Sequence, residues 1–123
     1  MSSEPLPNFT IGEINIICTD LERSLQFYCD VLGFEPLERE DPGYHLRCGD
    51  VRVLLLAVAT SGEIMPYCSN PEISIDLMVD DLLEAYRHLT DHGATIVSEF
   101  EPNSDRFFIR DPDGLVFEVI QHR

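Results

Sequence analysis

Three carboxylic acids, Glu13, Asp76 and Glu118, are the side chains of this chain best suited to chemistry. Each lies on the more polar side of a segment that alternates polar and apolar residues, so each is expected on one face of a β-strand. Carboxylates that are brought together repel one another, and the pKa of at least one should rise unless a cation neutralises it. A carboxyl group with a raised pKa can act as a general acid or base.

Arginines and histidines complicate this picture. Arg47 and Arg110 fall at equivalent positions of the two halves of the chain, and their guanidinium groups could instead neutralise the carboxylates. His88 and His92 lie four residues apart in a helical pattern. That spacing can bind zinc, but it also occurs on the solvated face of a helix.

The chain is strongly acidic. It carries eight arginines, no lysine and 23 carboxylates, for a net charge of −15 at pH 7. Such a surface repels phosphate backbones and anionic membranes, so neither nucleic acid nor a membrane is expected as a partner. The charge either attracts a cationic small molecule or serves solubility alone.

A chain of 123 residues with 44% hydrophobic residues has the size and composition of one globular domain. It contains no run of about 18 apolar residues, and its first residues lack the pattern of a signal peptide. We therefore expect a cytoplasmic protein. The four cysteines form no C-x-x-C pair and are expected to be reduced thiols.

The elements that position these side chains occur twice. Asp20 and Asp81 lie 61 residues apart, and each follows a strand pattern and precedes a helical one. Thr19 with Glu22 has the spacing of a capping box, and Asp81 with Glu84 shows a similar spacing, so a helix is expected to begin at each site. The repeat predicts two half-domains, with function in the cleft between them.

Each half is predicted to have the order β-α-β-β-β. Residues 60–71, which contain Gly, Pro, Ser and Asn, are expected to link a first module of about residues 9–59 to a second of about residues 72–122, within one domain, 1–123. Strands are expected at residues 13–18, 34–39, 44–48, 51–58, 73–79, 94–100, 106–110 and 115–121.

Two motifs make the chain recognisable. A D-L-x-x-S…F-Y…L-G-F run extends from Asp20 to Phe34, and a D-P-D-G…E run extends from Asp111 to Glu118. Over about residues 9–122 the chain resembles the vicinal oxygen chelate superfamily, which includes glyoxalase I, bleomycin-resistance proteins and extradiol dioxygenases. These motifs together indicate the fold and do not indicate a particular activity.

The resemblance implies an α+β fold in which two tandem βαβββ modules form an open, U-shaped mixed sheet around a cleft. Small members of this superfamily with two modules are typically homodimers, so the resemblance also implies a homodimer. It leaves open whether the modules pair within one chain or swap between two.

Metal-binding members of the superfamily place ligands on the first and last strands of the modules. By resemblance, those positions are Glu13, Ser74, Glu118 and either Leu54 or Leu55. Only Glu118 has the customary ligand type, so we expect a degenerate metal site and no cofactor. A divalent metal (Mg²⁺, Mn²⁺ or Zn²⁺) stays open if Asp76 supplies a third oxygen donor.

Two functions are consistent with these residues. The first is a small-molecule-binding protein, similar to the bleomycin-resistance branch, whose acidic and aromatic groove takes a cationic or aromatic ligand. The second is a lyase, isomerase or dioxygenase-like enzyme that uses Glu13 and Glu118, with Glu118 as the candidate catalytic residue. His45 is expected either to shuttle protons or to form a hydrogen-bonded wall of the pocket. The side chains expected in the cleft are Glu13, Asn15, His45, Ser74, Asp76, Phe108, Arg110 and Glu118.

Overall fold

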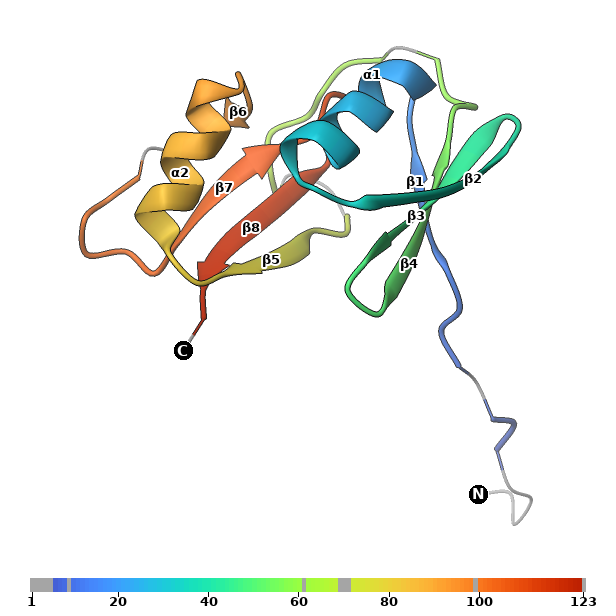
Figure 1. Cartoon of the computed structure of the whole chain (residues 1–123), viewed down its shortest axis with the longest axis horizontal. Coiled ribbons are helices and arrows are strands. Elements are labelled where there is room, and N and C mark those ends of the chain that lie inside the picture. Colours follow the sequence, from blue (N-terminus) through green and yellow to red (C-terminus); the bar gives the residue numbers. More distant parts are fainter. Residues whose placement is uncertain (1–5, 9, 61, 69–71, 99, 123) are drawn as a thin grey trace.

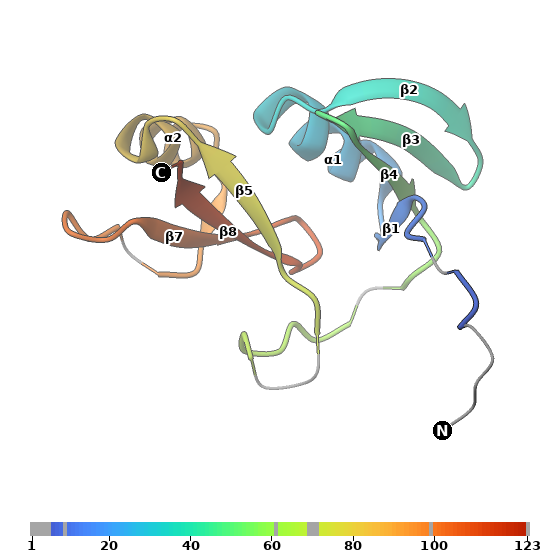
Figure 2. The ribbon, with the colours of Figure 1, turned by 90° about the horizontal axis from the view of Figure 1, so that it is seen from below.

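The computed structural model describes residues 6–8, 10–60, 62–68, 72–98 and 100–122 (Figure 1). Parts of the predicted linker (61 and 69–71) and of one predicted strand (99) lie outside the described residues, as do 1–5, 9 and 123. Two sheets, each with its own helix, lie side by side in both views (Figures 1 and 2). In the described ranges, no helix has the length and apolar character needed to cross a membrane.

The first module has four strands and one helical segment. These are β1 (Ile14–Ile17), α1 (Leu21–Leu25), the π-helical continuation η1 (Gln26–Val31), β2 (Glu35–Glu40), β3 (Gly43–Cys48) and β4 (Val51–Leu56). The sheet has the order β1-β4-β3-β2, in which β1 is parallel to β4 and the other pairs are antiparallel.

The second module repeats this arrangement. Its elements are β5 (Ile75–Val79), α2 (Leu82–Asp91), β6 (Thr95–Ile96), β7 (Arg106–Arg110) and β8 (Val116–Gln121). The sheet order is β5-β8-β7-β6, with β5 parallel to β8. The predicted α+β class and the two tandem βαβββ modules are therefore confirmed. The strand expected at residues 94–100 is shorter than predicted, because the chain leaves the sheet after the hydrogen bond from Val97 N–H to the Phe108 carbonyl.

Both helices begin at an aspartate. Asp20 accepts a hydrogen bond of 3.1 Å from the N–H of Arg23, and Asp81 accepts one of 3.0 Å from the N–H of Glu84. The two aspartates have almost the same extended backbone, with φ and ψ of −137° and 106° in one and −135° and 104° in the other. The prediction that Thr19 caps the first helix is wrong, because the Thr19 hydroxyl binds a residue of the other module.

One hydrophobic core joins the modules. The ring of Tyr28 in η1 packs on the ring of Phe117 in β8, with centroids 5.9 Å apart, and both side chains are fully buried. Tyr86 of α2 packs edge-on against Phe107 of β7 at 5.2 Å. The helices thus cover one face of the sheets, and the residues that alternate with the buried ones lie on the opposite, outer face (Figure 2).

Candidate functional site

The outer face of the second sheet gathers three predicted site residues in one row. Cross-strand register places Asp76 of β5 beside Glu118 of β8, and Glu118 beside Phe108 of β7. Register partners share a sheet face, so the two carboxylates and the ring are neighbours. The pKa of Glu118 is raised, first by a hydrogen bond with Asp76 and next by burial. This is the direction expected when two carboxyl groups lie next to each other.

The arginine beside this pair is not the one expected. Arg106 Nη1 lies 3.8 Å from Glu118 Oε2 and opposes the rise in the Glu118 pKa. The guanidinium of Arg110 instead donates to two backbone carbonyls, one in the linker and one in the turn before β8. Arg47 forms an ion pair with Glu35 in the first sheet. The alternative that Arg47 or Arg110 neutralises the acidic pair is therefore wrong, because both guanidinium groups bind elsewhere.

An aromatic side chain of the linker packs against Phe108. The ring of Tyr67, from the linker, lies 5.6 Å from the ring of Phe108, and its hydroxyl donates to Ser74 Oγ at 3.1 Å. Ser74 lies just before β5 and is half-buried. Sequence reasoning missed Tyr67, because the linker shows no periodicity that would place its side chains. Its aromatic character was the one available signal.

The equivalent row of the first sheet has different chemistry. Asn15 of β1 is the register partner of Leu54 in β4, and Leu54 is the partner of His45 in β3. Leu54 therefore stands where Glu118 stands in the second sheet, and Asn15 stands where Asp76 stands. A leucine cannot bind a metal ion, so this row offers fewer ligands than the second sheet does.

His45 is held between two carboxylates. Its Nδ1 lies 2.7 Å from Glu13 Oε2, and its Nε2 lies 2.5 Å from Glu40 Oε2. The hydrogen bond to Glu13, and then that to Glu40, raises the pKa of His45. His45 is therefore hydrogen-bonded through both ring nitrogens. Glu13 also lies 3.6 Å from Arg52, and these two residues line a groove of about 600 Å³.

In the part of the chain that the structure describes, the predicted site residues form two separate groups, one on each sheet. Among the described residues, Glu13 contacts polar groups of the first sheet, and Glu118 contacts those of the second. The strands of one sheet do not pair with those of the other there. Over the same residues, no group of three or more His, Cys, Asp or Glu is arranged to hold a metal, and this includes the combination of Glu13, Asp76 and Glu118.

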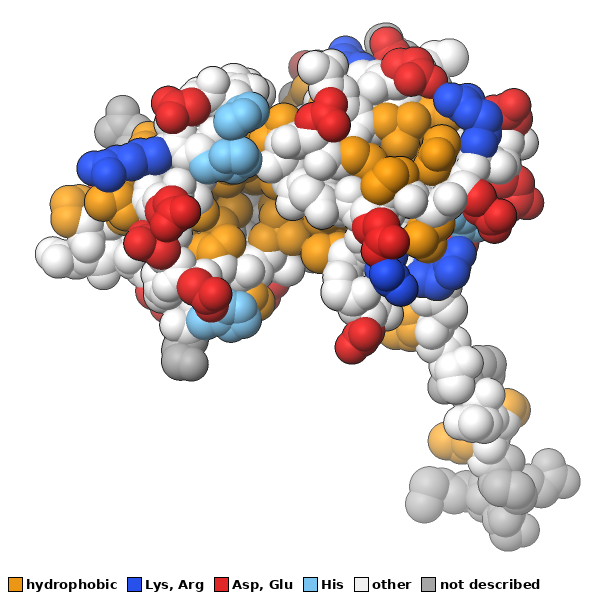
Figure 3. Space-filling model, in the orientation of Figure 1, with side chains coloured by type: hydrophobic (Ala, Val, Ile, Leu, Met, Phe, Trp, Pro, Cys, Tyr) orange, Lys and Arg blue, Asp and Glu red, His pale blue; other side chains and the backbone are white. Residues whose placement is uncertain are grey.

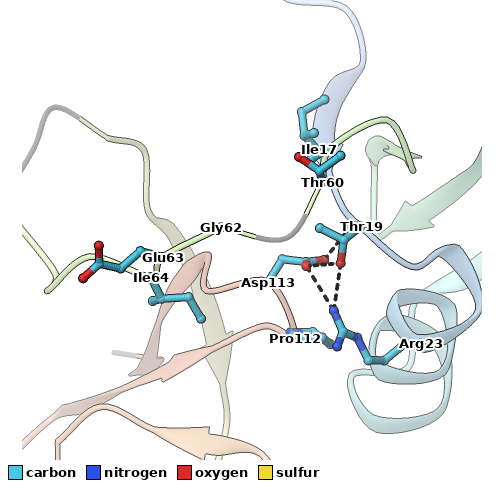
Figure 4. A pocket seen from close by; sticks show the side chains of 10 residues that line it. Ile17, Thr19, Arg23, Thr60, Gly62, Glu63, Ile64, Pro112 and Asp113 are labelled. Atoms are coloured by element: carbon cyan, nitrogen blue, oxygen red, sulfur yellow. Dashed lines mark hydrogen bonds and ion pairs between the residues drawn. The ribbon is translucent and has the colours of Figure 1, made fainter.

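The D-P-D-G motif joins the modules. Asp113 accepts hydrogen bonds from the Thr19 hydroxyl at 2.6 Å and from the Thr19 N–H at 3.1 Å, and it forms a 3.1 Å ion pair with Arg23 (Figure 4). Asp111 accepts a hydrogen bond of 2.7 Å from the Tyr28 hydroxyl. Burial raises the pKa of Asp111, although its hydrogen bonds oppose that rise. The sequence predicted only the turn at this motif.

A cavity of about 370 Å³ lies beside this joint. Figure 4 shows Thr19, Arg23 and Asp113 on one side of it and Glu63 and Ile64 of the linker on the other. The described hydrogen bonds join Thr19, Arg23 and Asp113 to one another. The polar groups on this side of the cavity therefore take part in the contact between the modules. Sequence reasoning missed the cavity because it depends on how the linker crosses between the modules.

Comparisons with known proteins agree with this fold. The Bacillus subtilis (strain 168) protein named catechol-2,3-dioxygenase is 31% identical over 122 residues, which cover 92% of this chain but only 41% of that protein. The bleomycin resistance protein of Geobacillus stearothermophilus is 27% identical over 117 residues, which cover 83% of this chain and 89% of that protein. The crystal structure of the fosfomycin resistance protein FosX from Mesorhizobium loti has a TM-score of 0.70 at 17% identity, and covers 93% of this chain and 92% of that one.

These matches carry different weight. The similarity to the FosX structure shows the fold alone, and this chain spans less than half the length of the Bacillus subtilis relative. The family's sequence profile matches residues 10–119, which extend from before β1 into β8. The chain therefore belongs to the glyoxalase/bleomycin resistance protein/dioxygenase superfamily.

Proposed function

We propose that this chain binds a small cationic molecule with an aromatic part, on the outer face of the second sheet. The proposed binding groups are the carboxylates of Asp76 and Glu118 and the rings of Phe108 and Tyr67. Membership of the superfamily supports a small-molecule site, and relatives named bleomycin resistance protein support a binding role.

The observation that carries this proposal is the pairing of Asp76 with Glu118. Two carboxylates that face each other across neighbouring strands destabilise the sheet, and the raised pKa of Glu118 reflects their interaction. A ligand cation placed between them would relieve that repulsion. Arg106 at 3.8 Å supplies only partial compensation, and its side chain is 38% exposed. The net charge of −15 would also raise the local concentration of cations.

Aromatic groups support the second half of the proposal. Phe108 lies beside Glu118, and Tyr67, whose hydroxyl is bound to Ser74, adds a second ring beside Phe108. Ring faces attract cations, and offset rings stack on planar groups. A ligand that joins a cation to a planar ring would therefore use both features of this surface.

The proposed ligand binds without a metal ion. Leu54 occupies the place that Glu118 has in the repeat, and Glu13, the other expected carboxylate donor, is already bound to His45 and close to Arg52. A three-ligand site would need donors that this arrangement does not gather. We therefore propose that the metal site of the superfamily is degenerate in this chain.

We further propose that a second copy of the chain completes the cleft. β1 and β5 are both edge strands, each paired on one side. They expose apolar side chains, with Ile14, Ile17 and Met78 at 36%, 49% and 46% exposure. Open strand edges with apolar residues favour association. A homodimer would bring the outer face of a first sheet, with Glu13 and His45, next to the outer face of a second sheet from the partner.

Calorimetry with a matched set of ligands tests the proposal. Benzylamine, benzyl alcohol and benzoate have the same ring with a cation, a neutral group and an anion, and bleomycin is added as a larger probe. We expect benzylamine to bind more tightly than the alcohol, benzoate not to bind, and the affinity for benzylamine to fall with added salt.

Glu118→Gln should weaken benzylamine binding by roughly tenfold, about 1.4 kcal/mol. Glu101→Gln, which changes an exposed acid elsewhere, is the control and should leave benzylamine binding unchanged. Failure of any cation to bind at low salt would contradict the proposal.

An enzyme is the second candidate, and the raised pKa of Glu118 favours it. A carboxyl group that stays protonated above its usual range can serve as a general acid or base, and relatives of this chain are named lactoylglutathione lyase and catechol dioxygenase. Assays of those two reactions, with and without Mg²⁺, Mn²⁺ and Zn²⁺, would reveal such an activity. Glu118→Gln should abolish it, whereas unchanged turnover in that variant would remove Glu118 from the mechanism.

A further inference from the structure

Two imidazole rings pack together near the end of α2, away from the acidic pair. His88 and His92 lie one helical turn apart, and their ring centroids are separated by 4.3 Å with 41° between the ring planes. Both residues are exposed, and histidine side chains adjoin over α2 on the molecular surface (Figure 3). Residues four apart share a helix face, so both rings are open to the same solvent.

Each ring uses one nitrogen to bind a backbone carbonyl. Nε2 of His88 lies 2.8 Å from the carbonyl oxygen of Val31 in η1, and Nδ1 of His92 lies 2.8 Å from the carbonyl oxygen of His88. A carbonyl oxygen only accepts, so these two nitrogens carry the hydrogens. In the neutral rings, Nδ1 of His88 and Nε2 of His92 then carry the lone pairs. Histidines that bind metals commonly show this pattern, because the bound N–H fixes the tautomer and the ring orientation.

The separation of the rings is close to that of a chelate. Two imidazoles that bind one ion through bonds of about 2.0–2.1 Å have centroids about 4.5 to 5 Å apart. The observed 4.3 Å is slightly shorter, so the two rings would have to move apart slightly to share an ion. The site also lies at the C-terminal end of α2, where the helix carries partial negative charge and favours a cation.

We propose that His88 and His92 bind one divalent transition-metal ion, with water in its remaining coordination positions. Imidazole nitrogens suit Cu²⁺, Ni²⁺ and Zn²⁺ and not Mg²⁺ or Ca²⁺. Among the described residues no third His, Cys, Asp or Glu joins the pair in a metal-binding arrangement, so the affinity should be moderate. Because Nδ1 coordination keeps the hydrogen on Nε2 of His88, the ion would also stabilise the contact of α2 with Val31 in the first module.

Titration of the full chain with Ni²⁺ tests this site. Calorimetry with Ni²⁺ in the presence of a reducing phosphine should give one ion per chain with a micromolar Kd. Cu²⁺, titrated without the phosphine because phosphines reduce it, should bind more tightly than Ni²⁺ or Zn²⁺. His88→Gln and His92→Gln should each weaken Ni²⁺ binding at least tenfold. Glutamine keeps an amide N–H that can replace the bond to the carbonyl, so both variants should retain the fold. His122→Gln, which removes another exposed histidine, is the matched control and should bind Ni²⁺ as the wild type does.

Two results would overturn the proposal. Wild-type protein that binds none of the three ions has no such site. Equal Ni²⁺ affinity in wild type, His88→Gln and His92→Gln would place the ion elsewhere, for example at the exposed thiols of Cys48 and Cys68. Paramagnetic broadening of amide signals by Ni²⁺ gives the location directly and is expected around the end of α2. Glu118→Gln should leave Ni²⁺ binding unchanged, so this proposal and the proposed ligand site can fail independently.

Discussion

The hydroxyl of Tyr28 donates a hydrogen bond of 2.7 Å to the carboxylate of Asp111, and both side chains are buried where the two modules meet. Asp111 also accepts the backbone N–H groups of Asp113 and Leu115 within its own turn. One carboxylate therefore shapes the turn before β8 and fixes η1 of the first module against it. The relative position of the two outer faces depends on this joint.

Removal of the Tyr28 hydroxyl tests the joint. Tyr28→Phe leaves an oxygen of a buried carboxylate without its donor, and this should lower the free energy of unfolding by about 1–3 kcal/mol. Urea denaturation followed by circular dichroism measures the change. Tyr44→Phe is the matched control, because the described contact of Tyr44 is between its ring face and Arg39, which phenylalanine retains. Equal stability of both variants and the wild type would contradict a structural role for the Tyr28–Asp111 bond.

Gly43 of β3 lies close against the backbone of β4. A Cβ at this position would lie 2.3 Å from the carbonyl oxygen of Leu55 in β4, so Gly43→Ala must displace backbone. We expect a loss of at least about 1–3 kcal/mol, the usual range for overpacking. Gly12→Ala, where a Cβ would meet no atom within 4 Å, should be close to neutral in the same denaturation experiment. A neutral Gly43→Ala would show that β3 and β4 are spaced differently.

The raised pKa of Glu118 predicts how stability depends on pH. Between the usual glutamate pKa and the raised value, the folded state holds more protons than the unfolded state, so its stability falls as pH rises through that interval. Glu118→Gln removes this dependence and should stabilise the fold above the interval by about 0.5 kcal/mol, the size of a cross-strand charge effect. Urea midpoints from about pH 4 to pH 8 measure it. A wild type and a variant with parallel pH profiles would be inconsistent with the Asp76–Glu118 interaction.

His45 predicts a second pH dependence in another range. Its folded-state pKa is raised by Glu13 and Glu40, so its stabilising contribution is complete below the usual histidine pKa and is lost as pH rises through the folded value. His45→Gln should therefore cost more stability near about pH 6 than near about pH 9. His122→Gln, at an exposed histidine 3.9 Å from Asp80, is the control and should show a smaller change. Ring-proton NMR of His45 should give a titration midpoint above the usual histidine pKa.

Local sequence patterns were sufficient to predict where the helices begin and which strand residues share a face of a sheet. Asp20 and Asp81 start both helices because an aspartate side chain can bind the free N–H groups of the first turn next to it. Alternation in β5 and β8 placed Asp76 and Glu118 on one face because successive strand residues point to opposite sides. Both signals involve residues that are close together in the chain, so a single sequence is enough to detect them.

Contacts between distant residues were not predictable in this way. Thr19 was expected to cap α1, but its hydroxyl donates a hydrogen bond to Asp113, 94 residues away. Arg110 was expected near the acids, but backbone carbonyls, which no sequence pattern identifies, bind its guanidinium. Tyr67 lies in the linker, whose sequence shows no hydrophobic periodicity, and its ring packs near that of Phe108. In each case the outcome depends on how the modules and the linker pack.

Amide NMR mapping of benzylamine binding tests the central claim most directly. The proposed site predicts chemical-shift changes concentrated at Asp76, Phe108 and Glu118, with the same residues unaffected by benzoate. Phe108→Ala should reduce the changes, because it removes the ring next to the acidic pair. Shift changes confined to the cavity beside Asp113, or no changes at any concentration, would show that the outer face of the second sheet is not the ligand site.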